Sequence, residues 1–547
     1  MFTLALVLTL ALLQSGAVPE GPARPPRPGE VPLAQDTTAL VHVNVIPMDR
    51  ERLLMRRTLI IAGGKILALG HSDSVKVPPG IRTIDGGDSV FVLPGLADMH
   101  SHIRYENDLA LLLANGVTTT RNMRGTAFQL TLRRRIADGS LLGPRLYTAG
   151  VRMNGTPQTG ATPAEARALV AEQAKAGFDF IKVYDGLSKA SYAAVVAEAR
   201  RWGLPVAGHV PDAVGVLGAL AAGQASIEHA EQVVNHYFGD DFDPARVATV
   251  PRAIAAAGTY VTPTLEYIST LELQWDNPDS LMRRPDIRYL DPETYAFWRT
   301  DPGHNSWYNH AMEPLLGALV RGFRDAGVKI LAGTDFYIVG NVAGFALHRE
   351  LQSLVDAGLT PYQALETATR NPAEFLHDLA HSGTVAQGKV ADLVLVVGNP
   401  LVDIGRTSHV AGIVLRGRWL SGAELRRRVD SLAQAFRGER ELIDRLLTNG
   451  GQFSTTALDS APAFQSSSLN QVGYRLLGQG RKDDAVAVFE LVTRRYPASG
   501  GAFDSLGDGY SAAGRKQDAI MAFDKALQLD PSQDDTRRKL AALRAAP

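Results

Sequence analysis

The sequence predicts an α/β protein that consists of a (β/α)8 TIM barrel, a small β-sandwich built from the two segments that flank it, and an all-α repeat region at the C-terminus. Three observations lead to this prediction. Between about residues 96 and 379, short apolar runs alternate with helical patterns, as in repeated βα units. Strand-like runs separated by Gly and Pro turns occur on both sides of this region. A period of 34 residues marks the C-terminal part of the chain.

Length and charge exclude some classes of protein. The chain has 547 residues, enough for two to four domains, and is 45% hydrophobic. Its 56 basic and 57 acidic residues give a formal net charge of -1, so we expect no nucleic-acid partner and no attraction to an acidic membrane. Cysteine is absent, which excludes disulfides and a lipid-modified cysteine.

The first residues indicate export. Residues 1–13 are almost wholly apolar and small residues follow at 15–17, but the run is shorter than the roughly 20 residues that span a bilayer. We therefore expect a signal peptide over 1–17 and a periplasmic or secreted protein. Because no Lys or Arg precedes the apolar run, an uncleaved anchor or a misassigned start stays open. Residues 18–36 are rich in Pro and Gly and predict a flexible linker.

Strand-like runs before the barrel predict a small antiparallel sheet, because Gly-Gly, Pro-Pro-Gly and Gly-Gly-Asp turns separate them. Similar runs return at 391–397 and 413–419. We expect the two sets to pair across the chain into one composite domain of residues 37–95 and 380–430. The runs of the first set are 41–46, 58–62, 65–69 and 83–92.

The region between these flanks, residues 96–379, contains eight candidate strands. Helical patterns at 163–176 and 189–202 have the length needed to cover the outside of a parallel barrel. The candidate strands are 93–102, 116–120, 145–149, 178–183, 205–209, 226–229, 259–262 and 329–333.

The C-terminal part of the chain repeats itself. Four residues, Gly473, Ala485, Phe489 and Pro497, recur 34 positions later as Gly507, Ala519, Phe523 and Pro531. This period resembles the tetratricopeptide repeat. We expect a helical or linker segment over 431–465 and TPR-like repeats over 466–547, with a helix at 534–546 capping them. A protein partner, a homo-oligomer and bracing of the barrel all stay open as roles, as do two chance helical hairpins.

The chemistry is carried by residues at strand ends. His100-Ser101-His102 follows an apolar stretch, and alternate residues of a strand face the same side, so both imidazoles point together. Neutral imidazoles are good zinc ligands, although solvated or core histidines are the commoner explanation for a lone His-x-His pair. Barrel enzymes place functional residues at the C-terminal ends of strands. Five further residues of ligand type lie at such ends: His102, Lys182, His209, His229 and Asp335.

These motifs together resemble the amidohydrolase superfamily, in its imidazolonepropionase-like branch that includes metal-dependent Xaa-Pro dipeptidases. The resemblance covers about residues 37–420 in the family's order. The matching segments are 93–102, 116–119, 181–183, 207–209, 227–229, 332–335, 369–373 and 388–393.

The resemblance implies a site for two divalent metal ions, and histidine-rich ligation favours zinc. The first metal is expected on His100, His102 and Asp335. The second is expected on His209 and His229. The implied ligands are His100, His102, Lys182, His209, His229 and Asp335.

Lys182 resembles the family lysine that carbon dioxide converts to an N6-carboxylated side chain. A free ammonium has no lone pair for a cation, whereas the carbamate is an anionic bridge between two metals. The resemblance further implies that a hydroxide shared by the metals is the nucleophile, and that Asp335 passes its proton to the leaving amine. The bridging lysine favours hydrolysis over deamination.

We therefore expect an exported, binuclear metal-dependent hydrolase that acts on a small amide or peptide, such as a dipeptide or an N-acyl amino acid. A lactonase or other esterase stays open, because the same hydroxide attacks esters. A scaffold protein with a vestigial barrel, recruited through the repeats, is the alternative outside enzymology.

Substrate selection is expected in the aromatic-rich stretch from 266 to about 312, which forms either a lid over the barrel or a packed helical subdomain. The candidate substrate-binding residues are Arg121, Arg152, Tyr184, His304 and His310.

Overall fold

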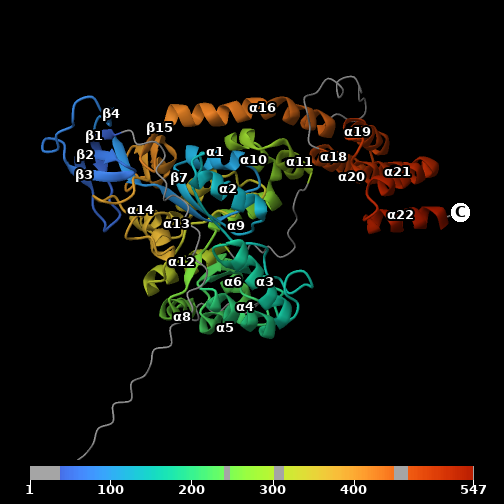
Figure 1. Cartoon of the computed structure of the whole chain (residues 1–547), viewed down its shortest axis with the longest axis horizontal. Coiled ribbons are helices and arrows are strands. Elements are labelled where there is room, and N and C mark those ends of the chain that lie inside the picture. The colour runs from blue at the N-terminus through green and yellow to red at the C-terminus, as the bar shows by residue number, and fades with distance from the viewer. Residues whose placement is uncertain (1–36, 239–246, 301–312, 449–465, 546–547) are drawn as a thin grey trace, which may run out of the picture.

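The computed structural model describes residues 37–238, 247–300, 313–448 and 466–545 (Figure 1). The expected signal peptide and linker lie outside these ranges. Over the described ranges, no helix combines the length and the apolar character needed to cross a membrane. Parallel strands alternate with helices through the middle of the chain, so the predicted α/β class is confirmed.

Strands from both flanks form one eight-stranded sheet, at the left of Figure 1. Its order is β15-β14-β13-β5-β1-β2-β3, and β4 pairs with β1. β5 and β13 pair antiparallel, with Leu93 opposite Val394, so the two flanks join as the sequence predicts. The strands are β1 (Thr38–Val45), β2 (Leu54–Ala62), β3 (Lys65–His71), β4 (Arg82–Asp85), β5 (Val90–Pro94), β13 (Leu393–Val397), β14 (Val410–Leu415) and β15 (Arg418–Ser421).

This sheet differs from the prediction in two respects. The described strands form a single sheet in place of a two-sheet sandwich, and the sheet is mixed, because β4 and β5 both run parallel to β1. The reason lies in residues 72–81, which lead from β3 to the other edge of β1. Val75, Val77 and Ile81 of this connection pack on a cluster that includes Val41 of β1. A strand reached by such a crossover lies parallel to its neighbour.

The middle of the chain forms two parallel sheets, β6-β7-β8 and β12-β11-β10-β9. Isolated parallel bridges join β8 to β9 at Ala149 and join β12 to the extended segment around Ile330. The Met99 N–H of β6 donates to the carbonyl of Ala332 at 2.8 Å. The strands are β6 (Leu96–Ser101), β7 (Val117–Asn122), β8 (Arg145–Thr148), β9 (Ile181–Val183), β10 (Val206–Gly208), β11 (Ser226–Glu228) and β12 (Tyr260–Thr262).

Local capping explains where two predicted helices begin. α3 (Pro163–Ala176) starts with Pro at its first position, and Thr162 and Glu165 form a reciprocal capping box. α4 (Lys189–Arg201) starts after Ser188, whose hydroxyl accepts from the Ser191 N–H. Both agree with the predicted ranges to within one residue.

The other helices of the middle region follow the strands and cover them (Figure 1). They are α1 (Asn107–Ala114), α2 (Ala127–Ala137), α5 (Gly215–Ala222), α6 (Ala230–Val233), η1 (Val234–Phe238), α8 (Thr249–Ala257), α9 (Leu265–Asp276), α10 (Pro278–Met282), η2 (Pro285–Tyr289), α11 (Pro292–Thr300), α12 (Glu313–Ala326), α13 (Phe345–Asp356), α14 (Pro361–Thr367) and α15 (Arg370–Phe375). A further short helix, η4 (Ile404–Ser408), lies between β13 and β14 of the flanking sheet.

One long helix, α16 (Gly422–Thr448), connects the sheet domain to the C-terminal helices along the top of Figure 1. It begins before the boundary expected at residue 431, because Leu425 and Val429 already belong to its buried face. Five helices follow it over the described residues 466–545: α18 (Ser466–Gly478), α19 (Lys482–Arg495), α20 (Gly500–Ala512), α21 (Lys516–Leu529) and α22 (Asp534–Ala545).

The 34-residue period corresponds to two helical hairpins with the same internal contact. A Cβ placed on Gly473 of α18 would lie 2.4 Å from the Phe489 ring of α19. A Cβ on Gly507 of α20 would lie 2.4 Å from the Phe523 ring of α21. Glycine is therefore required in each hairpin because a phenylalanine ring occupies the space of its side chain.

This contact makes Gly507→Ala destabilising, although alanine favours helices. We expect a local loss of about 1–3 kcal/mol, because the added methyl group overlaps Phe523. Gly478→Ala is the matched control, since a Cβ there meets no atom within 4 Å; we expect it to be neutral or stabilising by up to about 1 kcal/mol. Hydrogen exchange of the α20 and α21 amides measures the difference, and equal protection in both variants would contradict the packing argument.

Candidate metal centre

Three ligand side chains that are far apart in sequence meet at one point. His100 Nε2 lies 3.6 Å from Asp335 Oδ1, and His229 Nε2 lies 3.9 Å from Asp335 Oδ2. One ligand atom from each residue lies within 4.8 Å of the other two. His100 belongs to β6, His229 directly follows β11, and Asp335 follows the segment around residue 330. The ends of parallel strands therefore deliver all three.

Two further predicted histidines extend this cluster. His102 Nε2 is 2.9 Å from Asp335 Oδ1, and its ring centroid is 5.5 Å from that of His100. The ring centroid of His209, the residue after β10, is 4.9 Å from that of His229. The four histidines and Asp335 thus form one continuous group.

Lys182 is buried beside this group, on β9, opposite Ala207 of β10. Its Nζ is 6.0 Å from the centroid of the Tyr184 ring. Burial lowers the pKa of Lys182 to about 8, although the carboxylates of Glu228 and Asp335 oppose this shift. A neutral amine, the form that reacts with carbon dioxide, is therefore well populated near pH 8.

Carboxylates fix the orientation of two of the imidazoles. His100 Nδ1 donates to Glu228 Oε2 at 3.0 Å, and His209 Nδ1 donates to Asp185 Oδ1 at 2.8 Å. Each Nε2 is left free to ligate. Metal-binding histidines commonly have this arrangement, in which a carboxylate holds the other ring nitrogen.

His229 is held by a hydroxyl group. Its Nδ1 lies 2.8 Å from Thr264 Oγ1, which itself donates to the Pro263 carbonyl at 2.8 Å and so accepts from the ring. His229, Thr264 and Asp335 all have positive φ, at 69°, 52° and 49°. Non-glycine residues adopt such angles at an energetic cost, and this kind of strain is concentrated at functional sites.

Burial keeps the imidazoles neutral. Desolvation lowers the pKa of His100 to about 4, and it holds the pKa values of His209 and His229 well below the ordinary range. Neutral imidazole is the ligating form, so protons do not compete for these nitrogens near pH 7. This donor set of neutral imidazoles and a carboxylate fits a divalent metal, and it suits zinc.

Arg121 occupies a different place from the one predicted. Its side chain is 1% exposed, and its Nη2 donates to both carboxylate oxygens of Glu228, at 2.7 and 2.8 Å. Its Nε donates to the Met99 carbonyl at 2.6 Å, and Nη1 to Ser226 Oγ at 3.0 Å. The guanidinium is thus fully engaged inside the protein. The prediction that Arg121 contacts substrate is corrected to a role in holding Glu228.

Arg152 and Tyr184 lie beside the group, as a substrate contact requires. The Arg152 guanidinium carbon is 4.5 Å from the centroid of the Tyr184 ring, and that ring is 3.9 Å from the His209 ring, centroid to centroid. Both side chains are partly exposed. The other two candidates, His304 and His310, lie outside the described residues.

The described part of the aromatic stretch, up to Thr300, packs as helices. Tyr289, Tyr295 and Trp298 are buried in the main core. The Tyr289 hydroxyl donates to an oxygen of Asp430 in α16, and Tyr295 pairs similarly with an aspartate of that helix. Of the two hypotheses for this stretch, these rings agree with a packed helical subdomain.

Sequence reasoning did not identify Glu228 or Asp185 as functional residues. A signal for Glu228 existed: it lies in a buried strand immediately before His229, and a carboxylate in such a place needs a partner. Asp98, also buried, accepts from the Thr334 hydroxyl at 2.7 Å and from the Thr334 and His100 N–H groups, each at 3.2 Å. Glu228 and Asp185 thus hold the rings of His100 and His209, whereas Asp98 holds the backbone next to these candidate ligands.

Comparison with known proteins gives one family match. A model of the amidohydrolase family matches residues 91–420, more than half of the chain. The ochratoxinase of Aspergillus niger is 25% identical over 433 residues, which cover 66% of this chain and 81% of the ochratoxinase.

Solved structures give similar results. Bottromycin amidohydrolase has a TM-score of 0.57 at 25% identity, covering 73% of this chain and 90% of its own. A Xaa-Pro dipeptidase with methionine bound in its active site has a TM-score of 0.54 at 22% identity, covering 71% of this chain and 100% of its own. At 22% identity, the likeness to the Xaa-Pro dipeptidase concerns the fold alone.

The contacts of Glu228 predict the effect of Glu228→Gln. The substitution removes the charge that pairs with buried Arg121 and weakens the hold on His100 Nδ1. We expect a stability loss of about 3–5 kcal/mol and a fall in metal affinity of about 10- to 100-fold. Glu198→Gln is the control, because Glu198 is also buried, at 7% exposed, but bonds Arg201 and Trp202 in another region. Competition with a chelator measures affinity, and an equal loss in both variants would contradict the role of Glu228.

The pKa of Lys182 predicts a pH dependence for its carboxylation. With the pKa lowered from 10.5 to about 8, about half of the amine is neutral at pH 8, against about 1 in 300 for an ordinary lysine. Because only the neutral amine reacts, carboxylation in the metal-free protein should increase as pH rises through about 8. Carbon-13 NMR with labelled bicarbonate measures the adduct, and Lys182→Arg is the control. A rise delayed to about pH 10 would show that burial does not activate this lysine.

Proposed function

The chain belongs to the amidohydrolase family, and on this premise we propose that it is a metal-dependent hydrolase of amide or peptide bonds in small substrates, such as dipeptides and N-acyl amino acids. The observation that carries the proposal is the meeting of His100, His229 and Asp335 within 4.8 Å. The names of the similar ochratoxinase, bottromycin amidohydrolase and Xaa-Pro dipeptidase support hydrolysis as the reaction class.

The proposed site holds two divalent metals, with zinc favoured. His100, His102 and Asp335 would bind the first ion, and the other two histidines the second. Lys182, once carboxylated, would bind both. Bound metals of this kind lower the pKa of water and polarise a carbonyl group.

Asp335 is suited to move the proton of the reaction. Burial raises its pKa, but His100, His102 and His229 outweigh burial and hold the pKa well below the ordinary range. The carboxylate is therefore ionised near neutral pH. It can accept a proton from the attacking water and then donate it to the leaving nitrogen of the substrate.

Arg152 and Tyr184 are the proposed substrate contacts. They lie next to His209 and stay partly exposed. Arg152 offers a cation for the carboxylate of a dipeptide or an N-acyl amino acid. The stacking on Tyr184 holds the guanidinium in place.

We also propose that the eight parallel segments close into the (β/α)8 barrel expected from the sequence. The bridges at Ala149 and Ile330 and the bond from Met99 to Ala332 support closure, because they connect successive segments and return to β6. The two hairpins with their Gly–Phe contacts support TPR-like repeats, which offer a surface for a protein partner or a second copy. Export is proposed from the apolar run of residues 1–13.

The function is tested with metal-supplemented protein and a panel of dipeptides, N-acyl amino acids, lactones and other esters. We expect about two metals per chain and turnover of the amide substrates. Asp335→Asn should lower kcat at least about 100-fold, since it removes the proton carrier. Asp212→Asn, whose carboxylate is 73% exposed, is the control and should retain activity.

Other outcomes of the panel would overturn the proposal. Turnover of lactones or esters alone would make the protein an esterase of the same fold. A chain that holds no metal after supplementation and shows no hydrolysis would favour a scaffold.

A further inference from the structure

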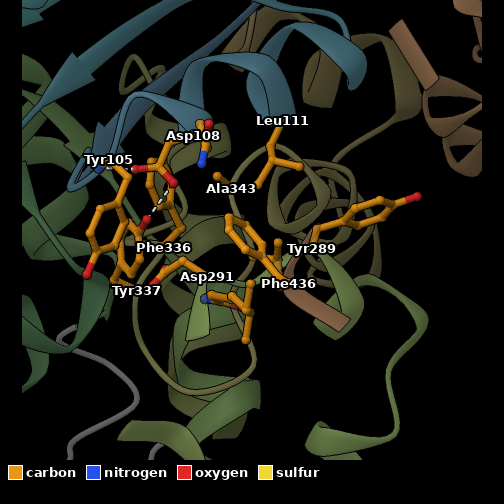
Figure 2. Close-up of a pocket in the computed structure, with 13 residues that line it drawn as sticks. Tyr105, Asp108, Leu111, Tyr289, Asp291, Phe336, Tyr337, Ala343 and Phe436 are labelled. Atoms are coloured by element: carbon orange, nitrogen blue, oxygen red, sulfur yellow. Dashed lines mark hydrogen bonds between the residues drawn. The ribbon is translucent and has the colours of Figure 1, made fainter. Parts of the chain in front are cut away.

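Asp108 connects the two loops that follow His102 and Asp335. It lies at the start of α1 and is 4% exposed. Its Oδ2 accepts from the backbone N–H groups of Arg104 and Tyr105, each at 2.9 Å. Its Oδ1 accepts from the hydroxyl of Tyr337, as the dashed line in Figure 2 shows.

The loop after Asp335 is strained where this bond is made. Tyr337 has a φ of 90°, and Asp335, two residues earlier, has a φ of 49°. Such angles in non-glycine residues persist only where surrounding contacts hold them. The Tyr337 ring is 8% exposed, and its hydroxyl is bonded to Asp108. The bond to Asp108 is thus one of the contacts that hold this loop.

The pocket around this bond is not a place for substrate. Tyr105, Asp108, Tyr289, Asp291 and Tyr337 are among its lining residues (Figure 2). Its volume is about 10 Å³, close to the minimum for one water molecule. This small space is therefore structural, and its polar groups act on the loops around it.

We propose that Asp108 is a positioning residue of the metal centre, and that it sets the place of Asp335 relative to His102 through its bond with Tyr337. The carboxylate holds the turn after His102 with one oxygen and the loop after Asp335 with the other. His102 Nε2 and Asp335 Oδ1 lie 2.9 Å apart, and both residues would bind the first metal. A change in either loop alters that separation. The inference rests on the proposed function, since it concerns metal binding by these two residues.

The neighbouring Tyr105 offers a matched comparison. Its ring centroid is 6.2 Å from that of Tyr337, so both tyrosines line the same pocket. The Tyr105 hydroxyl donates to Glu293 of α11 at 2.8 Å, away from the metal ligands. Removing either hydroxyl costs one hydrogen bond, which is buried for Tyr337 and partly buried for Tyr105, but of the two hydroxyls it is that of Tyr337 that is bonded to Asp108.

The test compares Tyr337→Phe with Tyr105→Phe in the full chain, by zinc titration against a competing chelator. We expect Tyr337→Phe to weaken zinc binding by about 10- to 100-fold, the usual effect of losing a group that orients a ligand. Tyr105→Phe should bind zinc within about twofold of wild type. At saturating zinc, Tyr337→Phe should lower kcat with little change in KM, because the substrate contacts are untouched.

Asp108→Ala provides a second variant, because alanine has no acceptor for the Tyr337 hydroxyl. If Asp108 acts through this bond, the double variant with Tyr337→Phe should lose no more zinc affinity than Asp108→Ala alone, because both changes break the same bond. Additive losses, or equal zinc affinity in Tyr337→Phe and wild type, would overturn the inference while leaving the proposed function intact. A wild-type chain that binds no zinc would overturn both.

Discussion

The buried ion pair between Arg121 and Glu228 is the interaction on which the candidate metal centre depends. It joins β7 to β11 across the interior, and Glu228 also holds the ring of His100 on β6. A carboxylate and a guanidinium that are about 1% exposed or less are tolerated only as a pair, because either one alone would be a buried, unpaired charge. The carboxylate of Glu228 therefore both neutralises Arg121 and orients the ring of His100. Three strands are tied to one geometry by a single carboxylate.

The same burial prepares the other groups for their proposed roles. Desolvation lowers the pKa values of His100, His209, His229 and Lys182, so these three histidines are neutral donors and the lysine is an amine that titrates near pH 8. Asp335 is the exception, because the surrounding histidines keep its pKa low despite burial. A site that lacked this burial would have protonated histidines in mild acid and an inert ammonium. The proposed metal binding and the proposed lysine carboxylation thus have a common physical origin.

Much of the architecture could be predicted, and the exceptions have a common cause. The first residues of α3 and α4 follow from the N-terminal caps at Thr162, Pro163 and Ser188, which act over three residues. The 34-residue period located the hairpins correctly, because Gly473 and Phe489 pack within one of them.

The direction of β4 was missed, since it depends on a crossover. The attachment of the sheet domain was missed as well: Arg145 of β8 binds Asp378 and Asp392 at 2.8 Å each, over more than two hundred positions.

The sequence by itself determined the elements and the chemical types at the strand ends, because apolar periodicity, caps and turns act between near neighbours. It also indicated which histidines, lysine and aspartate belong together, through motifs in a recognisable order. Only the tertiary structure decided what supports them. Arg121 looked like an anion-binding residue in the sequence, yet it meets Glu228 107 positions away and is buried. The partner of a buried charge depends on which strands become neighbours, and no local pattern records that.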